Sequence, residues 1–87
     1  MMWKTAAHTD AVELDGEWVL LDSQRYVVTK LNEAGGRVWG RLKEGATLEM
    51  LVADLVAEYE IDADRARMDI EAFVNRLSDA GMIEHVA

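Results

Sequence analysis

The segment YVVTKLNEAGGRVW, residues 26–39, constrains the fold most, because it changes from strand to helix with almost no connection. Its first four residues include three β-branched side chains, which favour a strand. Apolar residues at helical spacing follow, and only Leu31 and Asn32 separate the two patterns. The helix must therefore leave the end of the strand at close range. Gly35 and Gly36 lie in its first turns, where each costs about 1 kcal/mol relative to alanine, and we expect them to let a neighbouring element approach the helix backbone.

Two turns divide the residues before this corner into three predicted strands. Asp15-Gly16 is a strong signal for a two-residue hairpin, because glycine accepts the positive φ that primed turns require. Residues 22–24 predict a second, looser turn. The strands are therefore expected at residues 11–14, 17–21 and 25–30, as an antiparallel meander.

Helical periodicity follows to the end of the chain. Asn32, Thr47 and either Asp62 or Asp64 are good N-cap residues for three successive helices. The first is expected to end near Gly45, and Gly81 is a natural residue to follow the third. The order predicts an α+β domain resembling a winged helix-turn-helix, with a three-stranded antiparallel sheet followed by three helices. We assign this domain to residues 10–87 and a flexible N-terminal arm to residues 1–9.

The composition limits where such a chain works and what it contains. The 87 residues are enough for one domain, and the absence of cysteine excludes disulfides and thiolate metal sites. No apolar run reaches the roughly 20 residues of a membrane span. The first ten residues also lack the apolar segment of a signal peptide, which predicts a soluble cytoplasmic protein.

Catalysis has little support in the sequence. The two histidines, His8 and His85, lie near the ends of the chain and show no metal-ligand spacing. The acidic pairs near residues 58–64 are solvent-facing by pattern, and general acid–base chemistry would require their burial. We therefore predict that the chain is not an enzyme and has no cofactor and no metal.

The charge balance bears on the choice of partner. Nine Lys and Arg against 17 Asp and Glu give a formal net charge of −8, which disfavours nucleic acid and anionic membranes. A winged-helix DNA-binding regulator stays open as an alternative because of the order of the elements. Neither the second nor the third predicted helix offers the basic face that a recognition helix needs.

Peptide binding suits the third predicted strand, residues 25–30. If this strand lies at a sheet edge, its N–H and C=O groups are a template for another strand. Arg25 and Lys30 stand at its ends, and no proline interrupts the residues between them. An extended peptide could add to it, with side chains entering a cleft beside a helix. Two alternatives stay open: the strand is central and only packs, or it pairs with its own copy in a homodimer.

A series of motifs resembles the PqqD-like family, the RiPP precursor peptide recognition elements. In order, the motifs are L-L-D at 20–22, R-Y-V-V-T-K-L-N at 25–32, G-x-x-x-W-x-x-L at 35–42, T-L-E-M-L at 47–51 and D-I-x-x-F-V-x-x-L-x-x-A-G-M-I at 69–83. The resemblance implies a non-catalytic domain that binds the leader segment of a ribosomally made precursor peptide and delivers it to a maturation enzyme. Free-standing members serve a radical enzyme in coenzyme PQQ synthesis or a separate leader peptidase in lasso-peptide pathways. This short acidic chain is more similar to the lasso type.

The resemblance also implies which residues bind the peptide. In the family the leader adds as a strand to the third strand and lies in a cleft against the third helix. Carried over to this sequence, the strand wall comprises Arg25, Tyr26, Val27, Val28, Thr29 and Lys30, and the helix positions are Ala66, Asp69, Ile70, Phe73 and Arg76. Asp69 is the residue most expected to make a polar contact with the peptide.

Overall fold

The predicted antiparallel meander is the first sheet of the structure. In the computed structural model, which describes residues 2–86, β2 (Thr9–Leu14), β3 (Glu17–Asp22) and β4 (Val27–Leu31) pair in the order β2–β3–β4. Asp15 and Gly16, both at positive φ, form the turn between β2 and β3. β4 pairs with β3 alone among the described strands, so it is an edge strand.

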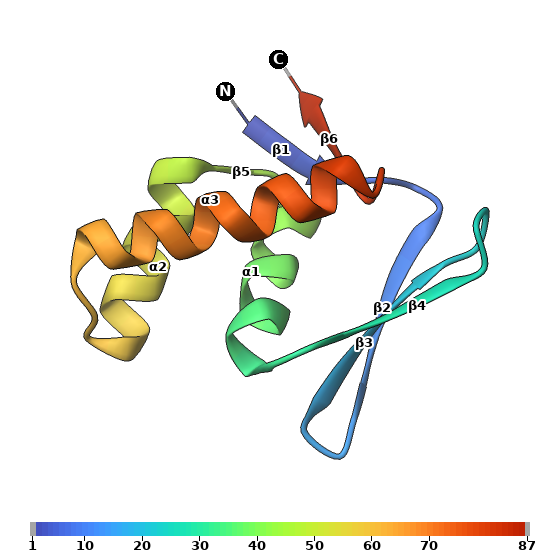
Figure 1. Ribbon diagram of the computed structural model, residues 1–87, viewed down its shortest axis with the longest axis horizontal. Coiled ribbons are helices and arrows are strands. Elements are labelled where there is room, and N and C mark those ends of the chain that lie inside the picture. Colours follow the sequence, from blue (N-terminus) through green and yellow to red (C-terminus); the bar gives the residue numbers. More distant parts are fainter. Residues whose placement is uncertain (1, 87) are drawn as a thin grey trace.

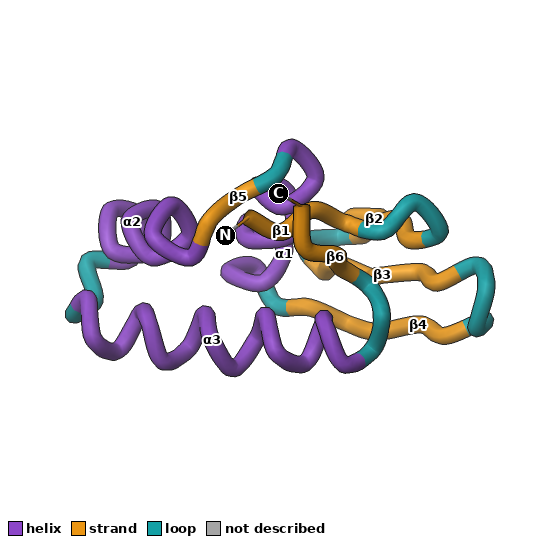
Figure 2. The backbone as a smooth tube through the Cα atoms, turned by 90° about the horizontal axis from the view of Figure 1, so that it is seen from above, coloured by secondary structure: helices purple, strands orange, loops and turns teal. Residues whose placement is uncertain are grey.

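Three helices follow the meander, which confirms the predicted α+β class. They are α1 (Glu33–Glu44), α2 (Leu48–Tyr59) and α3 (Ala63–Asp79). The side chains of Asn32, Thr47 and Asp62 accept backbone N–H groups of the first turns, so each acts as the N-cap that the sequence indicates. Figure 1 shows α3 crossing the other two helices, and Figure 2 shows α1 between α2 and the sheet.

A second sheet takes the place of the arm predicted for residues 1–9. β1 (Met2–Thr5) pairs antiparallel with β6 (Ile83–Val86) on one side and with the short β5 (Ala46–Thr47) on the other. Trp3 Nε1 donates a hydrogen bond to His85 Nε2 at 3.2 Å, between residues 82 positions apart in the sequence. The prediction of a flexible arm was therefore wrong for residues 2–5. No local pattern could identify a partner so distant along the chain.

Gly36 provides the close approach that the strand-to-helix corner requires. A Cβ atom at this position would lie 2.3 Å from Cδ1 of the Trp18 side chain, far inside contact distance. Trp18 lies on the same face of β3 as Leu20, which is fully buried. The indole therefore packs directly on the backbone of α1, and the helix can follow β4 after Asn32 alone. The prediction for the glycines is confirmed at Gly36.

The core lies between this inner face of the sheet and the three helices. Its most buried large side chains are Trp39 and Leu42 of α1, Leu20 of β3, Leu51 of α2 and Ile70 of α3. The register of β3 with β4 places Thr29 on the inner face and Val28 on the outer face. On that outer face Val12, Leu14 and Leu21 are also exposed.

Replacing Gly36 by alanine tests the contact with Trp18. The added methyl group must displace the partly buried Trp18 ring, so Gly36→Ala is expected to lower the free energy of unfolding by about 1–3 kcal/mol. Gly40→Ala is the matched control in the same helix, because a Cβ atom there meets nothing within 4 Å. That control should raise the free energy of unfolding by about 0.5–1 kcal/mol. Urea unfolding measures both, and equal effects at the two sites would contradict the role given to the contact.

Candidate functional site

A hollow of about 440 Å³ lies beside the open edge of β4. It is bounded by the end of β4, the first turns of α1 and the middle of α3, with Leu55 contributed by α2. Its apolar lining includes Leu31, Val38, Ile70 and Phe73. Together with the strand edge, this hollow is the candidate for the peptide cleft that the sequence predicts, and the name peptide cleft is used below for both.

Charged side chains stand at the rim of the peptide cleft. Lys30, Asp69 and Arg76 line it along with the apolar residues. The Arg76 guanidinium carbon lies 5.8 Å from the centre of the Phe73 ring, a cation–π distance. Asp69 Oδ2 lies 3.5 Å from Arg65 Nε on the same helix, and both side chains are more than half exposed. The ion pair of Asp69 is therefore exposed at the rim.

The hydrogen-bonding groups of β4 alternate between the sheet and the open side. Ser23 N–H donates to a carbonyl group just before β2, at 3.0 Å. The backbone N–H and C=O groups of successive residues in a strand point to opposite sides. Those of Ser23 point toward β2, so those of Asp22 point toward β4, where the partner of Asp22 is Val27. The N–H and C=O groups of Val28 and Lys30 then face the open edge. Two residues of β4 thus offer four unpaired backbone groups to an added strand.

The structure brings together part of the predicted strand wall. Val27 and Thr29 lie on the helix side of β4, Val28 faces the outer side, and Lys30 lines the hollow. Arg25 and Tyr26 were predicted in the strand but belong to the turn before it. Tyr26 adopts a positive φ of 56°, is 91% exposed and does not line the hollow.

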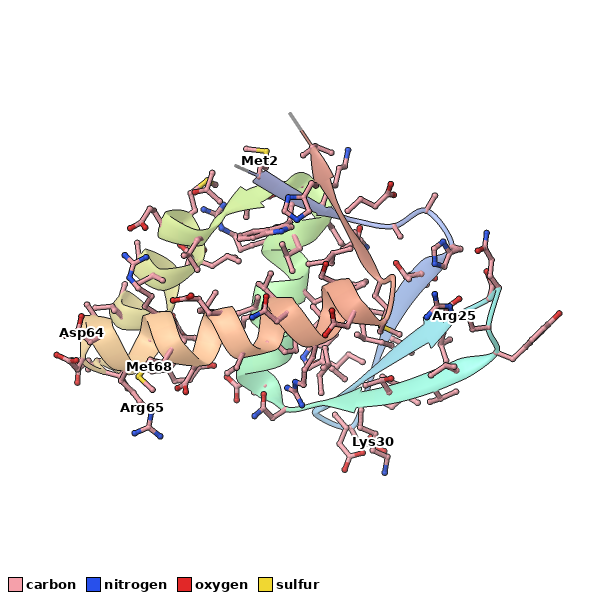
Figure 3. The ribbon with its side chains drawn as sticks, turned by 45° about the horizontal axis from the view of Figure 1, so that its top comes forward. Met2, Arg25, Lys30, Asp64, Arg65 and Met68 are labelled. Atoms are coloured by element: carbon pink, nitrogen blue, oxygen red, sulfur yellow. The ribbon has the colours of Figure 1, made fainter. Side chains whose placement is uncertain are left out.

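Arg25 closes one end of the peptide cleft instead of lining the edge. Its Nη1 donates to the carbonyl oxygen of Ala80 at 2.7 Å, which connects the start of β4 to the end of α3. Figure 3 shows Arg25 and Lys30 at opposite ends of the strand. The cleft is therefore tied at the Arg25 end, and its hollow lies at the Lys30 end.

Of the predicted positions on α3, all but one line the hollow. Asp69, Ile70, Phe73 and Arg76 all line the hollow. Ala66 is fully buried in the core and does not line it. The sequence reasoning missed a further set of lining residues, which are Leu31, Asn32, Ala34, Gly35, Val38, Leu55 and Ala72. Most of them belong to the strand-to-helix corner, so the short connection was the signal for their position.

A buried carboxylate supports the closed end of the cleft. Asp22 is 2% exposed, and its Oδ1 accepts the N–H groups of Gln24 at 2.9 Å and Arg25 at 3.1 Å. His8 Nε2 lies 3.7 Å from Oδ2. Burial raises the pKa of Asp22, but the two N–H donors and the charges of His8 and Arg25 outweigh it, so the pKa lies below its ordinary value. Asp22 thereby fixes the turn that presents Arg25 to Ala80.

Two further observations concern other kinds of site. Among residues 2–86, no group of three or more His, Cys, Asp or Glu side chains is arranged to hold a metal ion. No helix in the same part of the chain is both long enough and apolar enough to cross a membrane.

Comparison with known proteins identifies similar sequences and structures. The family described as "Coenzyme PQQ synthesis protein D (PqqD)" matches residues 17–83. No curated protein sequence matches the chain. The structure "TbiB1 in Complex with the TbiA(beta) Leader Peptide" is 30% identical, with a TM-score of 0.86 over 97% of this chain and 98% of that one. The structure "Lasso peptide synthetase B1 complexed with the leader peptide" is 26% identical, with a TM-score of 0.84 over 95% and 98% of the two chains.

The role of Asp22 predicts a specific pH dependence of stability. Because the folded-state pKa lies below the unfolded value, the carboxylate stabilises the fold above about pH 4 and loses this effect as the pH falls through the lower folded value. Asp22→Asn should therefore be less stable than the parent at neutral pH, and the difference should shrink below about pH 4. Urea unfolding from pH 3 to 7 measures it. Glu17→Gln, an exposed change on the same strand, should show no such trend, and a pH-independent loss in Asp22→Asn would contradict the assignment.

Proposed function

The chain belongs to the PqqD family, and we propose that it is a non-catalytic adaptor that binds the leader segment of a ribosomally synthesised precursor peptide and presents it to a maturation enzyme. The observation that carries this proposal is the open edge of β4 beside an apolar hollow. Two structures that resemble this chain over nearly its whole length are described with a leader peptide bound. Such a peptide is made by the ribosome, so we place the encounter in the cytoplasm.

The leader would bind by adding a strand to β4. Its backbone would pair with the exposed groups of Val28 and Lys30, which gives affinity without regard to sequence. Alternate side chains would then point toward α3 and enter the hollow, where Ile70 and Phe73 favour large apolar groups. Lys30 and Arg76 at the rim favour an acidic residue close to that apolar one.

We assign the chain to a lasso-peptide pathway, with a separate leader peptidase as the enzyme partner. One of the two similar structures is described as a lasso peptide synthetase B1. The coenzyme PQQ pathway, with a radical enzyme as partner, is the second candidate, because it supplies the name of the matching family. Binding assays with the two leader types distinguish them.

The contacts of the arginines weigh against the DNA-binding alternative. Arg67 of α3 binds Glu49 through two hydrogen bonds of 2.8 and 2.9 Å. Arg65, Arg37 and Arg41 are likewise paired with carboxylates. Phosphate contacts would have to break these pairs in a chain of net charge −8.

Calorimetric titration with the leader of the precursor peptide encoded beside this gene tests the proposal directly. Phe73→Ala should weaken one-to-one binding at least tenfold, because it removes the largest apolar side chain of the hollow. Met68→Ala is the matched control on α3, since Met68 is 68% exposed and does not line the hollow. Binding that is equally tight in both folded variants would contradict the cleft assignment. Duplex DNA in place of the leader should produce no heat.

A proline at Val28 tests strand addition separately from side-chain contacts. Val28→Pro removes an N–H group that faces the open edge and leaves the pairing of β4 with β3 intact. We expect roughly a tenfold loss of leader affinity with little change in thermal stability. Val28→Thr keeps the N–H group and should bind as the parent does. If the proline variant also keeps its affinity, the leader does not pair with this edge, and sedimentation analysis should then establish whether β4 pairs with its own copy.

A further inference from the structure

A second hollow lies between α1 and α2, outside the peptide cleft. It encloses about 570 Å³, and its floor is formed by Val38, Leu51 and Leu55. Gly40 of α1 and Ala57 of α2 line it and leave it wide, because neither carries a side chain beyond Cβ. This volume is in the range of cavities that hold a ligand group.

Gly40 has no packing role within the described chain. A Cβ atom there would meet nothing within 4 Å, whereas one at Gly36 in the same helix would collide with Trp18. A glycine in the interior of a helix costs about 1 kcal/mol relative to alanine. The contrast between the two glycines indicates that Gly40 keeps space open for something outside the fold.

Two ion pairs span the α1–α2 hollow. Arg37 Nη2 lies 3.1 Å from Glu58 Oε1, and Arg41 pairs with Asp54, so α1 and α2 are connected twice across the hollow. All four side chains line it. These four side chains are about half exposed, so they frame the entrance to the hollow above its apolar floor.

The α1–α2 hollow adjoins the peptide cleft. Val38 and Leu55 line both hollows, so these two side chains form a wall that the hollows share. Val38 lies in the second turn of α1, so the shared side chains are close to the Lys30 end of β4 and not to the end that Arg25 ties to α3. A peptide that continues past the Lys30 end of β4 would therefore leave the cleft on the side of the second hollow.

We propose that the leader peptide continues past the Leu31 end of β4 and places one large apolar side chain in the α1–α2 hollow. The apolar floor selects that side chain, and Arg37 and Arg41 with their acidic partners supply polar contacts for the backbone beside it. The leader is thus read at two sites, one beside β4 and one between α1 and α2. This inference rests on the proposed leader-binding function.

Two leucine substitutions on α2, compared with each other, test the second site. Ala57→Leu fills the hollow, and Ala53→Leu is its matched control one turn earlier on α2, exposed and outside the lining. The probes are the complete leader of the precursor peptide encoded beside the gene and shorter versions trimmed from either terminus. At one terminus of the leader, removal of the residues beyond the β4-binding segment should lower the affinity for the parent protein roughly tenfold.

Ala57→Leu should reduce affinity for the complete leader by a similar factor and leave affinity for the trimmed leader unchanged. Ala53→Leu should change neither. The Gly40 amide signal in an NMR titration should move with the complete leader and stay in place with the trimmed one. If Ala57→Leu binds the complete leader as tightly as the parent, the second site is wrong while the cleft stands. If the parent binds neither peptide, the proposed function fails as well.

Discussion

The contact between Trp18 and Gly36 is the one on which the rest of this structure depends. It brings the backbone of α1 against the inner face of the sheet directly after β4 ends, without a loop. A loop at that point would fill the space beside the strand edge with flexible backbone. Because the corner is tight, the hollow between β4, α1 and α3 has walls made of regular elements, which hold side chains in fixed positions more precisely than loops do.

Much of the fold was predictable because its signals are local. The N-cap residues, the Asp15-Gly16 turn and the apolar stripes each act within a few residues, and each is found where it was expected. The β5–β1–β6 sheet was missed because it pairs strands from opposite ends of the sequence. The strand start was placed two residues early because Tyr26, a good strand former, adopts a left-handed conformation in a turn that Asp22 stabilises.

The site was predictable in outline and less so in detail. Helical spacing brings Asp69, Ile70, Phe73 and Arg76 toward one groove, and this part of the family resemblance agrees with the geometry. Arg25 could not be placed, because its partner is a backbone carbonyl 55 residues away and any residue type offers one. The α1–α2 hollow could not be predicted either, because a cavity beside a glycine leaves no sequence pattern other than the glycine itself.

The pairing of β1 with β6 has a practical consequence for how the chain can be connected. The first and last described strands lie side by side, as Figure 1 shows, and none of the residues that line the peptide cleft belongs to either strand. A short linker can therefore join the ends, and new termini can be opened in the exposed Asp15-Gly16 turn as a circular permutant. For the same reason the domain can be inserted into a loop of another protein, because the insertion needs only two closely spaced attachment points in that loop.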